Sequence, residues 1–295
     1  MTDRGPEPYR PVHVERWSPD GRLTGGDDVA AEEPLQVVLD REPFAVVMRT
    51  PGHDLELVLG LLYVEGLIRT REDVAHAAVA ASGVPEAATP FPVRSLPEAE
   101  NLVELRLVHR RPKDERVGWQ RNLVASSACG ICGAAALDAL RDDLPMLPPG
   151  PTFRPAAIAS MAPALRASQA TFELTGGLHA AGIFDTGGRL LHIREDVGRH
   201  NAVDKLVGRA LLTGELPLHQ DALMVSGRAS FELAHKAVAA GIPLMAAVSA
   251  PSSLAVHVAH TFDLTLVGFL RGEQFNVYAG GERIDAGREG IDAGL

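Results

Sequence analysis

The sequence holds two cysteines, Cys129 and Cys132, in the segment Ser126-Ser-Ala-Cys129-Gly-Ile-Cys132-Gly133. Two thiols at this spacing can share one metal ion or one sulfur atom, and the glycines beside them leave the sulfurs accessible. A helix expected over 134–140 directs its N-terminal dipole at the pair, which lowers a thiol pKa and increases the nucleophilic thiolate. This segment is the first candidate for chemistry.

Three interpretations of the cysteine pair stay open at this point. A structural zinc site needs four ligands, and there is no second Cys-x-x-Cys or His-x-x-x-His pair to complete one. A thioredoxin-type redox site follows a strand within a βαβ frame, which is only weakly suggested here. The third interpretation is two small buried hydrophobic residues, although collecting every thiol in a glycine-flanked loop is poor design for a core. The pattern alone does not separate metal, disulfide and sulfur chemistry.

A second candidate is His179 in Thr175-Gly-Gly-Leu-His179-Ala-Ala181, at the start of an expected strand. A histidine there can be a ligand, a base or a cofactor contact, and a structural histidine is an equally ordinary alternative. Zinc deaminases carry His-x-Glu followed by a Cys-x-x-Cys pair. In this chain the order is reversed and Ala181 stands where the glutamate is essential. Deaminase chemistry is therefore not expected.

A third candidate is the string Arg194-Glu-Asp-Val-Gly-Arg-His-Asn-Ala-Val-Asp-Lys205, at a strand-to-helix junction. On the expected helix, Asp196, His200 and Asp204 stack on one face at i, i+4 and i+8. A solvated charged face is the ordinary alternative, but such junctions host ligands in α/β folds. We predict a ligand site here that includes Arg199, His200 and Asn201.

Two further strand–loop–helix junctions carry hydroxyl groups, Val225-Ser-Gly-Arg-Ala-Ser230 and Val248-Ser-Ala-Pro-Ser-Ser253. Helix N-termini with free backbone N–H groups suit phosphate oxygens, and an arginine adds charge and a forked donor. The alternative is that Ser230 and Ser252 are only N-caps. Together with Arg271-Gly272 after the last expected strand, the junctions predict a pocket for a large anionic ligand, lined by Ser226, Arg228, Ser249 and Ser252.

The composition sets limits on the class of protein. The chain has 295 residues and a formal charge of −10, with a pI near 5.6. This acidity argues against a general nucleic-acid or membrane-surface binder, which needs a basic face. No apolar run reaches the roughly 18–20 residues of a membrane span, and the polar N-terminus does not resemble a signal peptide. We expect a cytoplasmic protein.

The elements that must position these residues fall into an N-terminal and a C-terminal part. We expect a poorly ordered or extended segment over 1–31, a small α+β domain over 32–120 and an α/β domain over 121–295. The first domain should contain a hairpin of strands 35–39 and 44–48, a helix over 54–65, a loop over 80–100 and a strand over 102–108.

Apolar runs alternate with amphipathic helices in the C-terminal part, which indicates parallel strands joined by crossover helices. The expected helices cover 155–170, 197–212, 230–240 and 253–260, and the expected strands cover 172–174, 181–184, 190–193, 222–225, 242–248 and 264–270.

These strings resemble the FdhD family, sulfur carriers needed for formate dehydrogenase activity. The resemblance covers nearly the whole chain and rests above all on the long string at 194–205. It includes Thr50-Pro-Gly-His-Asp54, Cys129-Gly-Ile-Cys132-Gly133, Thr175-Gly-Gly-Leu-His179, Ser226-Gly-Arg-Ala-Ser-Phe-Glu232, Val248-Ser-Ala-Pro-Ser-Ser-Leu254 and Val267-Gly-Phe-Leu-Arg271.

The resemblance implies a sulfur relay. A cysteine desulfurase passes sulfur to Cys129 as a persulfide, with Cys132 as its partner. The carrier then transfers the sulfur to the molybdenum of a bis-molybdopterin guanine dinucleotide cofactor before insertion into apo-formate dehydrogenase. The chain would be a sulfurtransferase-type carrier rather than a multiple-turnover metabolic enzyme.

The resemblance also implies a fold and a cofactor site. The fold would be a cytidine-deaminase-like layered α/β/α domain with a smaller N-terminal domain, assembled as a homodimer. The bound cargo would be mimicked by a guanine nucleotide. The site would be formed by Phe269, Leu270, Arg271, Gly272, Glu273 and Gln274.

Overall fold

The computed structural model describes residues 7–80, 83, 89–97, 101–109, 144–285 and 287. These residues form two compact units, and each unit is discontinuous in sequence. The first contains the N-terminal residues together with Gln169–His179 and Glu195–Gly214; the second contains Ala180–Arg194 and the described residues of 133–168 and 215–295. Two segments of the C-terminal half thus belong to the N-terminal unit. The predicted domain boundary at 120–121 lies outside the described residues.

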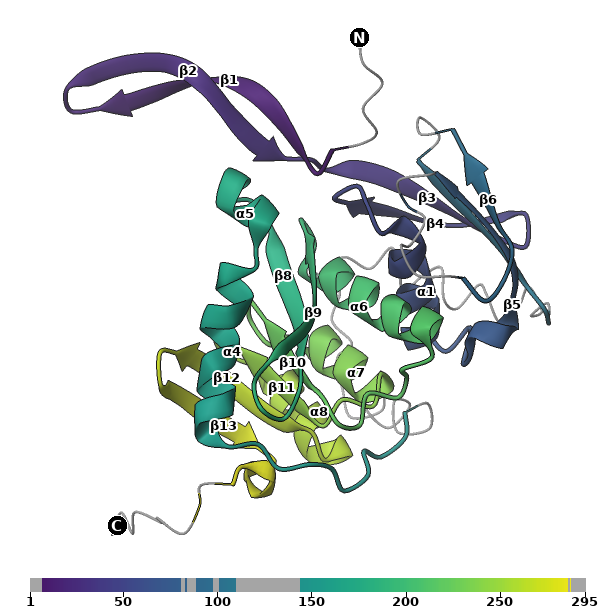
Figure 1. The fold of residues 1–295 in the computed structure, drawn as a ribbon, viewed down its shortest axis with the longest axis vertical. Helices are drawn as coiled ribbons and strands as arrows, with labels where there is room; N and C mark the ends of the chain where they lie inside the picture. Colours follow the sequence, from purple (N-terminus) through teal and green to yellow (C-terminus); the bar gives the residue numbers. More distant parts are fainter. Residues whose placement is uncertain are drawn as a thin grey trace. The chain divides into compact units, whose positions relative to one another are not determined.

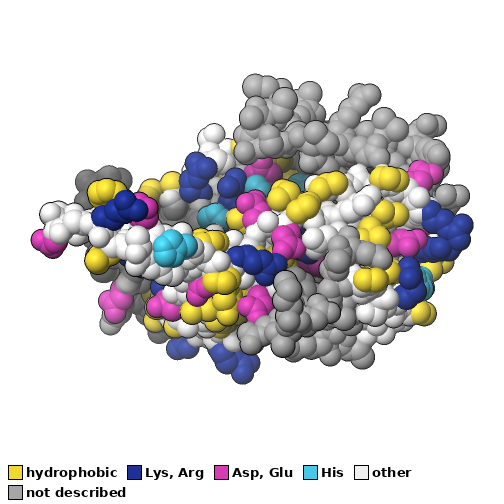
Figure 2. Space-filling view, turned by 90° about the horizontal axis from the view of Figure 1, so that it is seen from above, with side chains coloured by type: hydrophobic (Ala, Val, Ile, Leu, Met, Phe, Trp, Pro, Cys, Tyr) yellow, Lys and Arg dark blue, Asp and Glu magenta, His cyan; other side chains and the backbone are white. Residues whose placement is uncertain are grey.

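The N-terminal segment of the first unit forms an antiparallel hairpin. Strands β1 (Tyr9–Ser18) and β2 (Gly21–Ala30) pair along their whole length (Figure 1). The side chains of Trp17 and Leu23 are 73% and 71% exposed. In Figure 2 the hairpin lies at the left, and its basic, acidic and apolar side chains lie next to one another. Most residues of the hairpin are therefore exposed to solvent.

The first unit is built on a five-stranded sheet with the order β4-β3-β7-β5-β6. The predicted hairpin is confirmed: Asp40 and Arg41 both have positive φ (52° and 71°), as a tight two-residue turn requires. The expected loop over 80–100 contains a strand, so that prediction is wrong in part. The strands are β3 (Glu33–Leu39), β4 (Glu42–Arg49), β5 (Val74–Ala80), β6 (Val93–Leu96) and β7 (Leu102–Leu107), and a short 3-10 helix covers Arg71–Asp73.

Two helices of the first unit, α1 (Asp54–Val64) and α6 (Arg199–Thr213), pack at nearly backbone contact. A Cβ placed on Gly60 would lie 1.9 Å from the backbone oxygen of Asp204. A Cβ on Gly208 would lie 1.8 Å from the backbone oxygen of Glu56. Only glycine fits at either position, so this glycine pair fixes how α6 lies against α1.

The expected strand over 172–174 is wrong, because these residues lie in helix α5 (Ala170–Thr175). The Glu195 carboxylate accepts hydrogen bonds from the backbone N–H groups of Thr171 and Phe172 at 3.0 and 2.8 Å. This carboxylate satisfies N–H groups of the first helical turn, and Gly176 ends the helix with a φ of 65°. A capping residue that is distant in sequence thus overrides the local preference for a strand.

The second unit is built on the sheet β13-β12-β11-β10-β8-β9. Strands β10, β11 and β12 are parallel, as predicted, whereas β8 and β13 run antiparallel to their neighbours. Strand β13 was not predicted. The strands are β8 (His179–Phe184), β9 (Leu190–Asp196), β10 (Ala222–Val225), β11 (Leu244–Ala247), β12 (Thr265–Arg271) and β13 (Gln274–Ala279).

Helix α4 (Pro155–Ala167) covers one face of this sheet with Ile158, Met161 and Leu165, which pack against buried residues of β8, β10, β11 and β12 (Figure 1). Helices α7 (Phe231–Ala239) and α8 (Ser253–Phe262) pack on each other and contact β11 and β12. The unit is therefore a mixed α/β structure. Among the described residues, no helix is long and apolar enough to span a membrane.

Candidate functional site

The sequence-predicted site residues fall into three groups. Cys129, Cys132 and the helix expected over 134–140 lie outside the described residues. Ser226, Arg228, Ser249, Ser252 and the segment 269–274 belong to the second unit, and His179, Arg199, His200 and Asn201 belong to the first. The latter two groups are described in turn.

In the second unit, the loops after the parallel strands β10 and β11 are tied together by their backbones. The Ser249 N–H donates to the Gly227 oxygen at 3.4 Å, and the Ser252 N–H donates to the Ala229 oxygen at 2.9 Å. The structure thus brings the two predicted serine junctions together at the carboxyl ends of adjacent parallel strands. Open α/β sheets bind ligands at this edge.

Two of the predicted hydroxyl groups have structural partners. Ser252 Oγ accepts from the Ala255 N–H at 3.2 Å, which makes it an N-cap of α8. Ser226 Oγ accepts from the Ala180 N–H at 2.9 Å and thereby joins the loop to β8. The N-cap alternative is confirmed for Ser252, while the exposed Arg228 remains a candidate for contact with a phosphate.

The end of β12 joins the same group of loops through Phe269. Its N–H donates to the Ser249 oxygen at 3.2 Å, and its φ is 53°, in the left-handed region. The register between β12 and β13 shifts at this point. A Cβ on Gly268 would lie 3.1 Å from Pro251 Cδ, so the bulge and the β11–α8 loop are in close contact. A bulky residue held in a strained conformation at a strand end is a feature of functional sites.

The six residues predicted around the cofactor do not share one environment. Leu270 is 1% exposed and packs in the core of the second unit, so it belongs to the scaffold. The Phe269 side chain is 39% exposed. Arg271, Gly272, Glu273 and Gln274 are exposed at the turn between β12 and β13.

In the first unit, His179 and Arg199 lie close enough to interact electrostatically. Burial lowers the pKa of His179, the positive charge of Arg199 lowers it further, and Asp196 opposes the shift. The lowered pKa favours the neutral form of His179. Among the described residues, Arg199 Nε is buried and has no hydrogen-bond partner. A buried donor without an acceptor is costly, and a bound anion would satisfy it.

Asp196 does not belong to the helix face predicted from its spacing, because α6 begins only at Arg199. It ends β9, where its carboxylate is fully buried and contacts Lys205 Nζ at 2.7 Å. The predicted stack of Asp196, His200 and Asp204 is therefore wrong for Asp196.

The Asn201 side chain likewise forms hydrogen bonds within the protein. Its Nδ2 donates to the Met48 oxygen and to Asp196 Oδ1, both at 2.8 Å. The long string at 194–205 thus divides into scaffold residues and candidate ligand residues. Glu195, Asp196, Asn201 and Lys205 are scaffold, while Arg199 keeps an unsatisfied donor.

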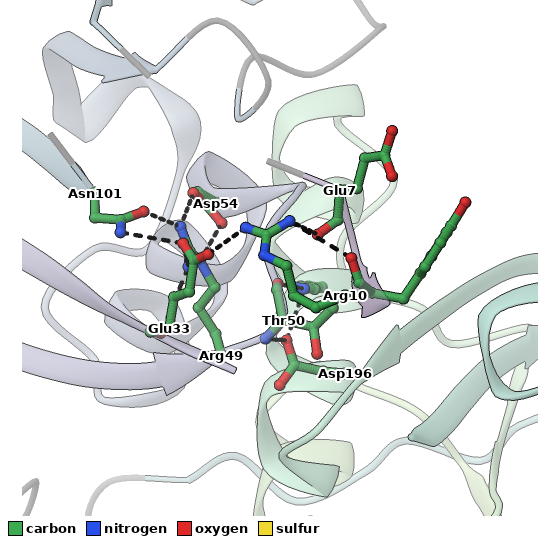
Figure 3. A network of polar contacts seen from close by, with 10 residues as sticks. Glu7, Arg10, Glu33, Arg49, Thr50, Asp54, Asn101 and Asp196 are labelled. Atoms are coloured by element: carbon green, nitrogen blue, oxygen red, sulfur yellow. Dashed lines mark hydrogen bonds and ion pairs between the residues drawn. The ribbon is translucent and has the colours of Figure 1, made fainter. Parts of the chain in front are cut away.

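Sequence reasoning missed the role of the residues that precede α1. Arg49 is 1% exposed, forms two hydrogen bonds of 2.9 Å with the Asp54 carboxylate, and donates to Asn101 Oδ1 at 2.8 Å (Figure 3). Thr50 donates its N–H to Asp196 Oδ2 at 3.2 Å. The string Thr50-Pro-Gly-His-Asp54 is visible in the sequence, but only the fold shows that it anchors the start of α6.

Comparison with known proteins agrees with this sequence pattern. The model of the FdhD/NarQ family matches residues 30–285. A sulfur carrier protein FdhD from Streptomyces avermitilis is 47% identical over 268 residues, which cover 88% of this chain and 90% of the relative. A protein of the same name from Mycobacterium tuberculosis is 43% identical over 281 residues, covering 94% of this chain and 99% of the relative.

A solved structure shows the same fold. The crystal structure of a protein assigned as a formate dehydrogenase accessory protein, from Desulfotalea psychrophila, has a TM-score of 0.70 and 24% identity. The match covers 94% of this chain and 100% of that structure. With the family match over residues 30–285 and relatives above 40% identity, the chain belongs to the FdhD/NarQ family.

Proposed function

We propose that this chain is a sulfur carrier for formate dehydrogenase. It accepts sulfur from a cysteine desulfurase as a persulfide on Cys129 and passes it to the molybdenum of a bis-molybdopterin guanine dinucleotide cofactor, which it holds as cargo until insertion into the apo-dehydrogenase. The observation that carries the proposal is the family match over residues 30–285, which includes both cysteines. The names of the relatives support it.

The sulfur steps need the two thiols, a persulfide donor and a dithiol reductant. The Cys129 thiolate attacks the outer sulfur of the desulfurase persulfide, so one S–S bond breaks as another forms, and the desulfurase leaves as a thiolate. No net oxidation occurs in this step. For release, the Cys132 thiolate attacks the inner sulfur of Cys129, the outer sulfur leaves as hydrosulfide, and a Cys129–Cys132 disulfide forms. A dithiol reductant then restores both thiols.

The strand-end loops of the second unit suit one part of the cargo. A guanine dinucleotide offers a pyrophosphate and a flat base. The exposed guanidinium groups of Arg228 and Arg271 would bind phosphate oxygens with forked, charge-assisted hydrogen bonds. The Phe269 ring would stack on the base. A free guanine nucleotide should therefore bind as a mimic of the cargo.

In the first unit, the N-terminal turn of α6 is a second element that suits an anion. Its N-cap, Gly198, supplies no capping side chain, and Arg199 adds a positive charge with an unpartnered buried Nε. The neutral form of His179 can donate or accept one hydrogen bond without adding charge. These features suit a phosphate or a pterin oxygen better than a cation.

The proposal extends to partners and assembly. The desulfurase and the apo-dehydrogenase are the protein partners, the chain works in the cytoplasm, and it assembles as a homodimer that holds a cargo with two similar halves. The deaminase-like α/β/α layering belongs to the same proposal. The mass and stoichiometry of the loaded complex test the assembly, since one cofactor on an isolated monomer contradicts it.

Mass spectrometry tests the sulfur step. After incubation with a cysteine desulfurase and cysteine, Cys129 should gain one sulfur atom, and Cys129→Ala should abolish the gain. The matched variant Cys132→Ala should still load, because it keeps the attacking thiolate. An unchanged mass in the wild-type chain contradicts the proposal that Cys129 carries the sulfur. If Cys129→Ala/Cys132→Ala still supports formate dehydrogenase, the chain is a cofactor chaperone without covalent sulfur transfer.

A further inference from the structure

The buried carboxylate of Asp196 has four donors around it and lies just before the start of α6. Its Oδ1 accepts from the Gly198 N–H and from Asn201 Nδ2, both at 2.8 Å. Its Oδ2 accepts from the Thr50 N–H at 3.2 Å and contacts Lys205 Nζ at 2.7 Å. The carboxylate is 0% exposed, so these four donors are what keeps its charge stable inside the protein.

Thr50 holds the same turn through both its backbone and its side chain (Figure 3). While its N–H donates to Asp196, its Oγ1 accepts from the Val197 N–H at 3.1 Å. Its carbonyl oxygen accepts from Lys205 Nζ at 3.0 Å. A single residue before α1 therefore binds both ends of the segment 196–205.

Asn201 holds the turn from the helix side. One Nδ2 group bridges Asp196 Oδ1 and the Met48 oxygen, so it ties the first turn of α6 to the end of β4. Gly198 makes room for this bridge, because a Cβ there would lie 2.8 Å from Asn201 Nδ2. The arrangement leaves the turn little freedom.

We propose that Thr50 and Asn201 are positioning residues, which act through Asp196 to fix the first turn of α6 and thereby the place of the Arg199 guanidinium. Arg199 stands between Gly198 and Asn201, and both of these are bonded to the same carboxylate. Its backbone is thus fixed on both sides. The buried Nε then keeps its unsatisfied position until an anion arrives, which is the preorganisation that tight binding requires.

This inference rests on the proposed function, because it gives Arg199 an anion to bind. A purely structural role predicts something different: the contacts would stabilise the α1–α6 pair, and loosening them would lower stability without changing the surroundings of His179 in the folded protein. The two roles can therefore be separated in the absence of any ligand.

The experiment follows the His179 resonance by NMR in the full-length, histidine-labelled protein, with the signal assigned by its loss in His179→Gln. The variant Arg199→Gln is the reference, because removing the positive charge should raise the pKa of His179 and gives the shift with which the other variants are compared. Thr50→Val keeps the shape of the side chain and removes the acceptor for the Val197 N–H. Because the Arg199 guanidinium would then no longer be held in place, Thr50→Val should raise the pKa of His179, as Arg199→Gln does. The variant Thr50→Ser keeps the hydroxyl and should show the wild-type pKa.

Asn101→Gly is the matched control. It removes hydrogen bonds to Arg49 and Glu33 in the same unit but leaves the α6 turn intact. It should lower stability and leave the pKa of His179 unchanged. If Thr50→Val does not fold, Asn201→Ala replaces it as the test and should likewise raise the pKa of His179.

A folded Thr50→Val or Asn201→Ala protein with the wild-type pKa of His179 overturns the proposal, and so does an equal shift in Asn101→Gly. Binding of guanosine diphosphate, measured on the same proteins, tests the cargo separately. If the wild-type chain does not bind it while the pKa pattern holds, the cargo assignment fails and the positioning role stands.

Discussion

At the scale of single residues, charge at the strand ends of the second unit determines what that edge can bind. Arg228 and Arg271 are exposed and lie in or beside the loops that the backbone of Ser249 joins. The chain as a whole is acidic, at −10, so the attraction for a phosphate must be local.

Replacing Arg228 or Arg271 with alanine should weaken the binding of guanosine diphosphate about tenfold, since one charge-assisted hydrogen bond is worth roughly 1.5 kcal/mol. Persulfide loading should not change. Calorimetry at one fixed salt concentration measures the affinity. Arg189→Ala is the matched control, because Arg189 is an exposed arginine of the same unit that pairs with Asp185. Equal weakening by the control would indicate only general electrostatic attraction.

His235 makes the second unit sensitive to acid. Burial lowers its pKa from 6.5 to about 4, with Lys236 as a smaller cause. The unfolded chain therefore binds the proton more readily, and stability present above pH 6.5 is lost as the pH falls toward 4. The free energy of unfolding should fall by about 1 kcal/mol per pH unit in this window. His235→Leu, compared by urea unfolding at several pH values, should remove that part of the slope; an unchanged slope contradicts the assignment.

The Asp221 carboxylate lowers the stability of the second unit at neutral pH. Burial and the nearby carboxylates of Glu215 and Asp185 raise its pKa from 3.8 to about 6. A raised carboxyl pKa means that stability present below pH 3.8 is lost as the pH rises through 6. Asp221→Asn should therefore stabilise the protein at pH 7 by about 1 kcal/mol, a value reduced for solvent screening at this half-buried position. Thermal unfolding at pH 7 and pH 4 tests this, because the gain should vanish at the lower pH.

At the scale of elements, the packing of α1 on α6 depends on two glycines. Gly208→Ala places a methyl group 1.8 Å from the backbone oxygen of Glu56, which no side-chain rotation can relieve. The free energy of unfolding should fall by about 3 kcal/mol, at the upper end of the range for overpacking. Chemical denaturation measures it. Gly26→Ala is the control, since a Cβ there meets nothing within 4 Å, and its effect should be small.

The elements also show how far sequence can predict this structure. The parallel strands β10, β11 and β12 and the helices between them were predicted, because short apolar runs and capping residues are local signals. Helix α5 was not, since its cap, Glu195, lies more than twenty residues away. Strand β13 was missed because only one of its six residues is buried, whereas β10 and β11 are fully buried apolar runs.

The same reasoning explains the mixed outcome for the candidate site. The strand-end loops follow from topology, and the sequence predicted them correctly as neighbours. The roles of Asp196 and Asn201 did not follow, because a buried carboxylate with four donors and an exposed ligand-binding one look the same in a sequence. Only the partners of each group separate scaffold from ligand contact.

At the scale of the whole molecule, the chain is not two domains in succession. Glu195–Gly214 belongs to the first unit although it follows strands of the second. Helix α6 in this segment packs directly on α1, and ten of the eleven residues of α1 are buried. The first unit should therefore need the C-terminal half of the chain in order to fold.

A fragment of residues 1–132 tests this dependence. Without α6, helix α1 loses the helix that packs on it and Thr50 loses the carboxylate of Asp196, so burial worth several kcal/mol is missing. The fragment should show no cooperative unfolding transition and little hydrogen-exchange protection in α1. Fusing residues 195–214 to its C-terminus through a flexible linker should restore part of both. A fragment that unfolds cooperatively without this addition would mean that the five-stranded sheet and α1 form a core of their own.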